Sequence, residues 1–300
     1  DRQDKNNAKE PKIKKLVIIG LGLIGGSLAL ALRRADYVGT IVGCSRSQST
    51  LDKALQMGMI DQGELDVAVA VRNADMVVLA APILSTQALF ESMKNELSDH
   101  TIITDAGSVK RYVVEAAKNV FGHIPPQLVP GHPIAGSEKS GVTAADVGLY
   151  RHHNVILTPM SETDEQAVTT VRLMWESVGA NVIQMDVDHH DEVLAATSHL
   201  PHLLAFSLVD TLAGKPDNKE IFKYAAGGFR DFTRIAASDP TMWHNIFVAN
   251  QNATLKVLDQ FSTGLAELRT AIQYNDGEKV LGVFTRAKVA REHFSLILEH

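Results

Sequence analysis

The feature that most limits the fold is an alternation of two kinds of segment between residues 14 and 185. Short runs rich in Val, Ile and Leu are separated by polar or mixed stretches long enough to form helices. Runs that are apolar on both faces predict strands of a parallel sheet that is covered by helices on both sides. The predicted strands are 16–20, 41–44, 76–80, 101–104, 127–129, 155–157 and 182–185. We therefore expect an α/β fold with a doubly wound sheet.

The pattern changes after Asp186, where strand-like runs stop. Apolar residues then recur at three- and four-residue spacing over 191–212, 241–268 and 277–298, which predicts an all-helical remainder. The chain is thus expected to hold two domains, an amino-terminal α/β domain over 12–186 and a helical domain over 187–296. Helices this long and apolar predict one face buried against a second copy of the chain, although a bundle within one chain is the alternative.

Composition narrows the class of protein. The net charge of −6 is spread over interspersed signs, which argues against a nucleic-acid partner because phosphates require a concentrated basic face. Uninterrupted apolar runs, such as 76–81, are too short to cross a bilayer, and residues 1–11 lack the apolar core of a signal peptide. The single Cys44 can form neither an internal disulfide nor a thiolate zinc site. We expect a cytoplasmic protein with no membrane contact and no metal.

A glycine motif follows the first predicted strand and opens a helix over 24–35. Its three glycines are Gly20 for a tight turn, Gly22 for close approach of a pyrophosphate, and Gly25 for packing of helix against strand. Leu23 and Ile24 stand between the second and third glycines, at the N-terminus of the helix, whose free N–H groups would face the phosphates. Because strands are predicted on both sides of this helix, the motif indicates a dinucleotide-binding Rossmann domain.

The end of the second predicted strand bears on the choice of cofactor. A carboxylate there would bind the adenosine ribose hydroxyls and repel a 2′-phosphate, but this chain has Ser45, Arg46 and Ser47. An arginine between two hydroxyls suits a 2′-phosphate, which slightly favours NADP over NAD. The alternative is a solvated Arg46 beside a pocket that accepts either cofactor.

Two polar segments follow the next strands of the predicted sheet. Residues 105–110 contain Ser108, and residues 131–141 contain His132. Ligands of open α/β sheets bind at the carboxyl ends of strands, so both segments are candidates for the site. A histidine in a loop rich in Gly and Pro has little packing to do, which favours a chemical role for His132 over a structural one. Ser108 could instead be only the N-cap of the following helix.

The helical domain contains two further polar clusters. His199 and His202 flank Pro201, which predicts a locally irregular helix with imidazoles facing a cleft. Zinc is not favoured, because no third ligand lies at helical spacing except the distant His189 and His190. Arg230 and Arg234 follow a pair of glycines and are suited to binding a carboxylate, with ordinary surface ion pairs as the alternative.

Taken together, these segments resemble the prephenate/arogenate (cyclohexadienyl) dehydrogenase family of tyrosine biosynthesis, a branch of aromatic amino acid biosynthesis. The resemblance runs from about residue 14 to 294 and rests on 20–27, 105–110, 131–141, 198–202 and 227–234 in that order. It implies a Rossmann domain followed by a helical domain that forms a homodimer. It also implies an NAD(P)-dependent oxidoreductase that converts prephenate to 4-hydroxyphenylpyruvate, or arogenate to tyrosine, with release of CO2 and without a metal.

The resemblance also implies roles for single residues. His132 would accept the proton of the ring hydroxyl, and Ser108 would hold that hydroxyl and help to place the nicotinamide. Arg234 and His202 would bind substrate carboxylates, with His199 supporting the arginine.

The family pattern further implies that Glu138 gates the cleft, with Arg230 or Asp231 as its partner. Trp243 is either a wall of the ring pocket or a core residue. Prephenate and arogenate differ only in a keto or an amino group of the side chain, and both remain open as substrates.

Two other functions are weighed against this one. A two-domain dehydrogenase of the β-hydroxyacid type would carry a catalytic lysine where this chain has the segment 198–202, so it fits poorly. A non-catalytic nucleotide-sensing module would have lost its chemical groups, whereas His132, Ser108 and Arg234 are all present here.

Overall fold

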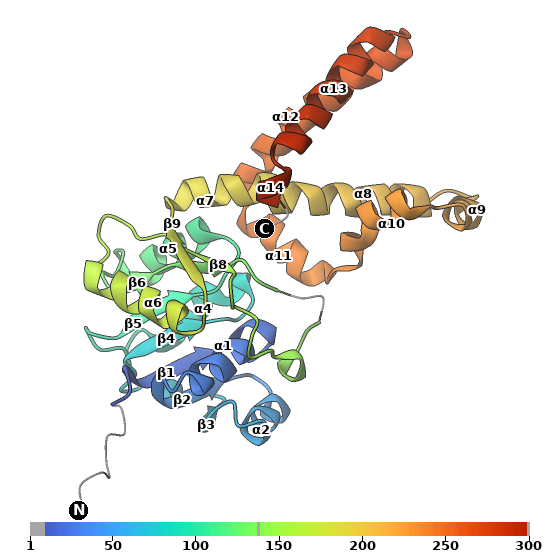
Figure 1. The fold of residues 1–300 in the computed structure, drawn as a ribbon. Helices are drawn as coiled ribbons and strands as arrows, with labels where there is room; N and C mark the ends of the chain where they lie inside the picture. The colour runs from blue at the N-terminus through green and yellow to red at the C-terminus, as the bar shows by residue number, and fades with distance from the viewer. Residues whose placement is uncertain (1–9, 137–138, 299–300) are drawn as a thin grey trace, which may run out of the picture. The chain divides into compact units, whose positions relative to one another are not determined.

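The computed structural model describes residues 10–136 and 139–298 (Figure 1). Its larger sheet has six parallel strands in the order β3-β2-β1-β4-β5-β6. This is the strand order of a dinucleotide-binding Rossmann domain. Successive strands are added on one side of β1 up to β3 and on its other side from β4 onward, so the order of connection reverses between β1 and β4 while the strands stay parallel. The strands are β1 (Ile13–Ile19), β2 (Val38–Cys44), β3 (Gln62–Glu64), β4 (Met76–Leu79), β5 (Ile102–Asp105) and β6 (Leu128–Val129). The predicted fold class is confirmed.

Helices cover both faces of this sheet, as the continuous apolar strands predicted. One face packs against α1 (Leu23–Arg34) and α6 (Glu165–Ser177). The other packs against α3 (Val67–Ala70), α4 (Thr86–Met93) and α5 (Lys110–Phe121). Alternate residues of β1 enter the two cores, because side chains of a strand point to opposite faces. A further helix, α2 (Gln48–Gln56), contacts β2 and β3.

A second, three-stranded sheet was not expected. It contains β7 (Gly131–Pro133), antiparallel to β8 (Asn154–Leu157), which in turn is parallel to β9 (Asn181–Gln184). The two last predicted strands therefore leave the main sheet. Two strands, β3 and β7, were missed because each has three residues without an aliphatic β-branched side chain. A strand that short is specified by its neighbours rather than by its own pattern.

One long helix begins directly after the second sheet. It runs through α7 (Val187–Leu194), a π-helical turn (Ala195–His199) and α8 (Leu200–Ala213). The π-turn lies just before Pro201, which lacks a backbone N–H, so the predicted irregularity is confirmed. By length and composition, 187–213 could span a membrane, with a mean hydropathy of 1.2 in its most apolar window and 28% of that window buried. Polar residues interrupt this helix, so it contains no long uninterrupted apolar run.

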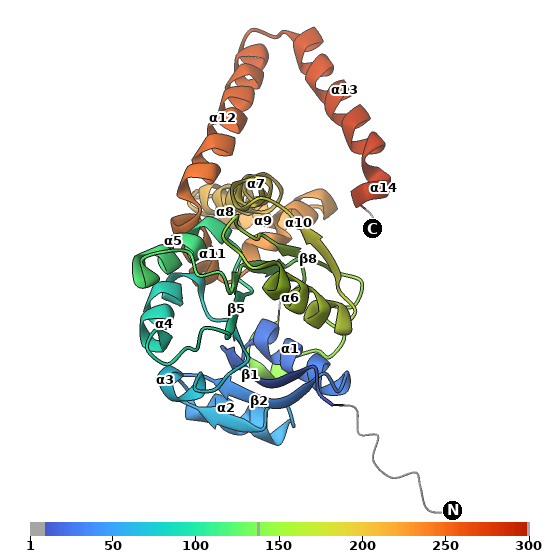
Figure 2. The same ribbon diagram turned by 90° about the vertical axis from the view of Figure 1, so that its left-hand side faces the viewer.

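The rest of the described chain is helical, as predicted. It contains α9 (Asn218–Lys223), α10 (Gly227–Thr233), a 3-10 turn (Arg234–Ala237), α11 (Pro240–Ala249), α12 (Gln251–Gln273), α13 (Gly277–His293) and α14 (Ser295–Leu298). The described part of the chain divides into two compact units between residues 251 and 252, so the boundary predicted after residue 186 falls inside the first unit. Figure 2 shows α12 and α13 as a splayed helical hairpin. Apolar side chains on it, including Leu265, Leu281 and Phe284, are exposed.

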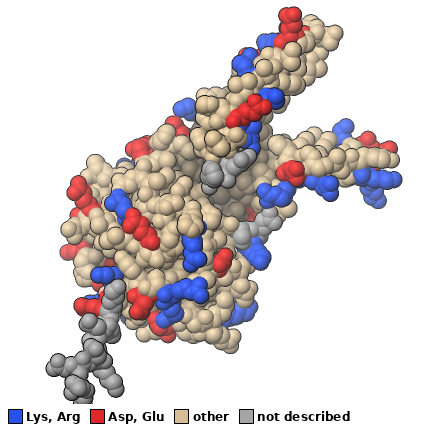
Figure 3. Space-filling view, viewed as in Figure 1, with Lys and Arg blue, Asp and Glu red and all other residues tan. Residues whose placement is uncertain are grey.

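Charged side chains of both signs are interspersed on the face shown in Figure 3. This mixing fits the moderate net charge of −6. The face in view carries no single continuous basic field of the kind that neutralises a nucleic-acid backbone.

Candidate active site

The glycine loop between β1 and α1 has room for a dinucleotide. Gly20 has a φ of +98°, and a Cβ there would lie 2.5 Å from the Ala80 carbonyl oxygen. A Cβ on Gly25 would lie 1.9 Å from the carbonyl oxygen of Gly20. Gly22 differs, since among the described residues none beyond its two chain neighbours has an atom within 4 Å of its Cβ position. The two outer glycines are required by backbone packing, and the middle one leaves open the space that a pyrophosphate would enter.

A cavity of about 310 Å³ lies at the point where the strand order reverses. Ile24 of α1 and Ser108 line it, together with residues 80–83 that follow β4. The opposite wall comes from α11 and the residue before it, with Asp239, Thr241 and Asn245 among the lining groups. Sequence reasoning missed this wall. The usable signals were Asp239 before Pro240, a helix start, and the four-residue spacing of Thr241 and Asn245.

Ser108 is not the N-cap of α5. The cap position belongs to Val109, whose side chain makes no capping bond. The first N–H groups of α5 are instead accepted by the carboxylate of Asp191, at 2.8 Å from Lys110 N and 2.9 Å from Arg111 N. Ser108 instead lines the cavity, and α7 is the element that caps α5.

His132 lies in β7 and not in a loop, which corrects the expectation from its Gly- and Pro-rich surroundings. It pairs with Ile156 of β8 and is buried. Its Nδ1 lies 2.8 Å from Nε2 of His190. Burial, followed by the nearby charges of His190 and Lys110, holds the pKa of His132 well below its ordinary range.

His190 continues the contact from His132 into α7. It is fully buried, and its Nδ1 lies 2.8 Å from Oδ1 of Asp191. Burial lowers the pKa of His190, although the Asp191 carboxylate opposes this shift. Sequence reasoning missed this pair because the helix was predicted to begin only at residue 191. The usable signal was the run 188–192, which lacks apolar side chains although it lies in a helix that packs on the rest of the domain.

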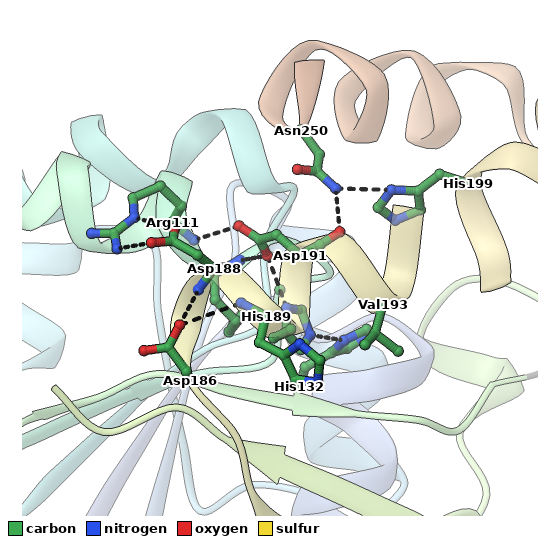
Figure 4. A network of polar contacts seen from close by, with 12 residues as sticks. Arg111, His132, Asp186, Asp188, His189, Asp191, Val193, His199 and Asn250 are labelled. Carbon is green, nitrogen blue, oxygen red and sulfur yellow. Dashed lines mark hydrogen bonds and ion pairs between the residues drawn. The ribbon is translucent and has the colours of Figure 1, made fainter. Parts of the chain in front are cut away.

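Asp191 is the centre of a wider network (Figure 4). Its backbone carbonyl accepts a hydrogen bond from Asn250 Nδ2 at 3.1 Å, and the same amide group contacts His199 Nδ1 at 3.1 Å. His199 is buried, and burial lowers its pKa to about 4, so its ring is neutral at pH 7. Asn250 is thus a hydrogen-bond partner of the His199 ring.

A buried ion pair lies under the same region. The Nζ of Lys110, fully buried, lies 2.5 Å from Oδ2 of Asp105 and also donates to the Gly131 carbonyl. Asp105 in turn accepts from the backbone N–H groups of Gly107 at 2.9 Å and Gly131 at 3.0 Å. Burial lowers the pKa of Lys110. These contacts connect the end of β5 to β7 and hold the backbone next to His132.

His202 stacks on Trp243, with ring centroids 3.7 Å apart and planes inclined by 20°. Its Nδ1–H donates to the Ser198 carbonyl oxygen at 2.8 Å, which leaves Nε2 for a ligand. Burial is the main cause of a lowered pKa for His202, and the Arg234 charge lowers it further. Trp243 is buried and belongs to a small apolar cluster with Val109 and Ile246.

The remaining predicted residues lie nearer the surface. Arg230 is exposed on α10, and Arg234 is exposed at the start of the 3-10 turn. Arg46 is exposed at the end of β2, between two serines that shape the turn. The Ser45 hydroxyl accepts from Ser47 N at 3.1 Å, and the Ser47 hydroxyl caps α2. Glu138 lies outside the described residues.

Carboxylates near the end of β2 were also missed. Glu64 of β3 pairs with Cys44, and Asp66 follows closely. Burial, with smaller contributions from these two acids, raises the pKa of the Cys44 thiol to about 11. Among the described residues, no group of three or more His, Cys, Asp or Glu is arranged to hold a metal ion.

Family models match nearly the whole chain. Residues 28–184 match the nucleotide-binding domain of prephenate dehydrogenase, and residues 186–286 match its dimerization domain. A cyclohexadienyl dehydrogenase of Zymomonas mobilis is 40% identical over 281 residues, which cover 93% of this chain and 95% of the relative. A prephenate dehydrogenase of Bacillus subtilis is 36% identical over 94% of this chain and 76% of its own length.

Solved structures agree with these matches. A prephenate dehydrogenase of Aquifex aeolicus, in complex with hydroxyphenyl propionate and NAD+, superposes with a TM-score of 0.87 at 37% identity and covers 95% of this chain and all of its own. An arogenate dehydrogenase of Synechocystis has a TM-score of 0.80 at 30% identity, covering 93% of this chain and 99% of that one. The chain therefore belongs to the prephenate dehydrogenase family of NAD(P)-dependent oxidoreductases.

Proposed function

We propose that this chain oxidatively decarboxylates a cyclohexadienyl substrate, prephenate or arogenate, with His132 as the base. The observation that carries the proposal is a buried histidine in β7, the strand that follows the last strand of the Rossmann sheet, held by a second histidine and a carboxylate. Such an arrangement has no packing purpose that an apolar side chain would not serve better, because burying polar groups is unfavourable unless they are paired. The family membership supplies the reaction in which a base is required.

His132 and Ser108 act on the hydroxyl of the substrate ring. Bound NAD or NADP supplies the acceptor for the hydride. A neutral imidazole can accept the hydroxyl proton as the ring carbon becomes a carbonyl carbon on the way to the aromatic product. A base placed in this way contributes about 10²- to 10⁴-fold to the rate. The Ser108 hydroxyl, on the wall of the cavity, orients the same group of the substrate.

Arg234 and His202 bind the substrate carboxylates. A guanidinium pairs with a carboxylate through two parallel hydrogen bonds and so fixes its orientation as well as its position. The charge of Arg234 is close enough to His202 to lower its pKa, which supports a shared site for an anion. His199 supports the arginine, and Glu138 with Arg230 or Asp231 gates the cleft.

The cofactor is NADP or NAD, with NADP used at least as well. Arg46 is exposed at the end of β2, where the adenosine ribose of a dinucleotide lies, and its neighbours Ser45 and Ser47 add no negative charge. Glu64 of β3 reduces the preference for NADP over NAD, because a carboxylate near that ribose favours NAD. The glycine residues and Leu23 and Ile24 bind the pyrophosphate through the backbone.

The helical part of the chain forms a homodimer, and the enzyme is cytoplasmic. The match of 186–286 to a dimerization domain and the exposed apolar side chains of α12 and α13 support the dimer. Sedimentation analysis should find twice the mass of one chain. A monomer at micromolar concentration would contradict this part of the proposal.

One assay tests the main proposal. Prephenate and arogenate are each incubated with NAD and with NADP, and formation of the reduced nicotinamide is followed by its absorbance. At least one combination should turn over, release CO2 and remain active in the presence of a chelator. Inactivity with both substrates and both cofactors, or loss of all activity on chelation, would overturn the proposal.

A further inference from the structure

We propose that His190 and Asp191 are positioning residues that fix the tautomer and orientation of His132, so that its Nε2 is the atom that accepts the substrate proton. The inference rests on the proposed function and extends it from β7 into α7. It concerns residues whose side chains reach the reacting atoms only through His132.

The order of hydrogen bonds determines where each proton lies. An ionised carboxylate only accepts, so the contact between Asp191 Oδ1 and His190 Nδ1 requires a proton on that nitrogen. The neutral His190 ring then accepts at Nε2. Its contact with His132 Nδ1 therefore requires the proton of His132 to lie on Nδ1. The lone pair of His132 is left on Nε2.

Asp191 is held rigidly enough to set this order. Its two carboxylate oxygens accept from the first N–H groups of α5, at Lys110 and Arg111, in addition to His190. Both oxygens of Asp191 therefore act as hydrogen-bond acceptors toward backbone N–H groups. Asn250 also donates to the backbone carbonyl of Asp191. The acceptor that starts the chain of hydrogen bonds is thus fixed by α5 and by the residue that follows α11.

The same contacts stabilise the charge that forms during reaction. When His132 takes up the hydroxyl proton at Nε2, the ring becomes a cation that keeps its Nδ1–H on His190. The positive charge is then balanced through His190 by Asp191. The other charged groups facing this pair are Lys110, which opposes the cation, and Asp105, which neutralises Lys110 across 2.5 Å. No proton beyond the one from the substrate is gained or lost.

The test compares a substitution at His190 with one at its neighbour. In His190→Phe the ring volume is kept and both hydrogen bonds are lost. We expect kcat to fall about 10- to 100-fold while KM changes less than about threefold, because the lost contacts act in the transition state. His189, adjacent but exposed, offers the matched control, and His189→Phe should retain full turnover. Circular dichroism and thermal unfolding establish that both variants fold.

A second substitution separates positioning from mere packing. In the His132→Asn background there is no base to orient, so adding His190→Phe should change kcat by less than about twofold. If His190→Phe acted only through an unrelated structural effect, it would lower kcat by the same factor in the wild-type and His132→Asn backgrounds. Equal effects of His190→Phe in both backgrounds would overturn the proposal. Normal turnover of His190→Phe beside an impaired His132→Asn would overturn only this inference. Normal turnover of His132→Asn would instead overturn the proposed function.

A spectroscopic measurement keeps the inference testable if His190→Phe does not fold. The nitrogen chemical shifts of the ¹⁵N-labelled His132 ring in the wild-type protein distinguish the two neutral tautomers. We expect the proton on Nδ1. A wild-type ring that carries its proton on Nε2 would contradict the proposal without any variant.

Discussion

The glycine loop, where we propose that the cofactor binds, and the surroundings of His132, the proposed base, are built in different ways. They are called the cofactor end and the base end below. Around the glycine loop, the chain makes space by omitting side chains, and the binding groups are backbone N–H groups. Around His132, the chain fills space with polar side chains that satisfy one another in a buried network. A site built from backbone N–H groups should tolerate substitutions that keep its space open. A buried network of side chains should lose its function when any one of its residues is replaced. The predictions below test this difference.

The largest expected effect is that of His132→Asn at the base end. Asparagine keeps a polar side chain but cannot act as a base at neutral pH, so kcat should fall about 10²-fold or more with little change in KM. Steady-state kinetics with the better substrate measures this. A near-normal kcat of this variant would show that His132 is not the base and that the buried network has no role in the reaction.

Arg234→Ala should come next and act mainly on binding. A charge-assisted pair with a carboxylate is worth about 1.5 to 3 kcal/mol, so KM should rise roughly 10- to 100-fold while kcat changes far less. Arg230→Ala is the matched comparison, because both arginines are exposed and four residues apart. An unchanged KM for Arg234→Ala with a raised KM for Arg230→Ala would exchange the two assignments.

Two glycine substitutions at the cofactor end should separate stability from binding. Gly25→Ala places a Cβ 1.9 Å from the Gly20 carbonyl oxygen and should destabilise the fold by about 1 to 3 kcal/mol or more. Gly22→Ala meets no atom within 4 Å and should fold normally, but should bind the cofactor about tenfold more weakly. Thermal unfolding and cofactor titration measure the two effects. Equal losses of stability would show that the loop is not open at Gly22.

The buried histidines at the base end should make the protein sensitive to acid. Burial lowers the pKa of His132 and His190, and lowers that of His199 to about 4, compared with an ordinary value of 6.5. Between about pH 6.5 and 4 the unfolded chain therefore binds more protons than the folded chain. The contribution of these histidines to the free energy of unfolding is full above about pH 6.5 and decreases as the pH falls toward 4. Urea unfolding at a series of pH values measures this trend. In His199→Asn the loss over this range should be smaller.

The pH profile of turnover should reflect the same burial. His132 must be neutral to accept a proton, and its pKa is lowered by burial, so the acidic limb of kcat/KM should lie below the ordinary histidine range. Activity would thus persist to lower pH than an exposed histidine permits. An acidic limb at or above about pH 6.5 would assign that limb to another group.

The smallest effect is expected at Arg46. Arg46→Ala should lower kcat/KM for NADP several-fold and leave NAD nearly unchanged, because only NADP carries a 2′-phosphate. Ser45→Asp should shift preference in the same direction by adding repulsion. Equal losses with both cofactors would make Arg46 an ordinary surface residue, and Glu64→Gln would then be the next variant to compare.

The sequence by itself determined the Rossmann sheet and the cofactor end. Strands such as 16–20 and 76–80 are apolar on both faces, and the glycines have a local steric purpose, so neighbouring residues carry the information. The all-helical remainder and the irregular turn before Pro201 follow equally from local pattern. The boundary drawn after residue 186, by contrast, remains a prediction.

Only the tertiary structure decided the base end. Asp191 caps a helix that begins 81 residues earlier in the chain, and His190 meets a histidine 58 residues away. No periodicity or motif records such distances, because the contacts arise when α7 packs against β7 and α5. The same packing buries His132 in a strand and lowers its pKa, whereas its sequence neighbours suggested an open loop. Local composition specifies elements, and burial specifies the chemistry of the groups they carry.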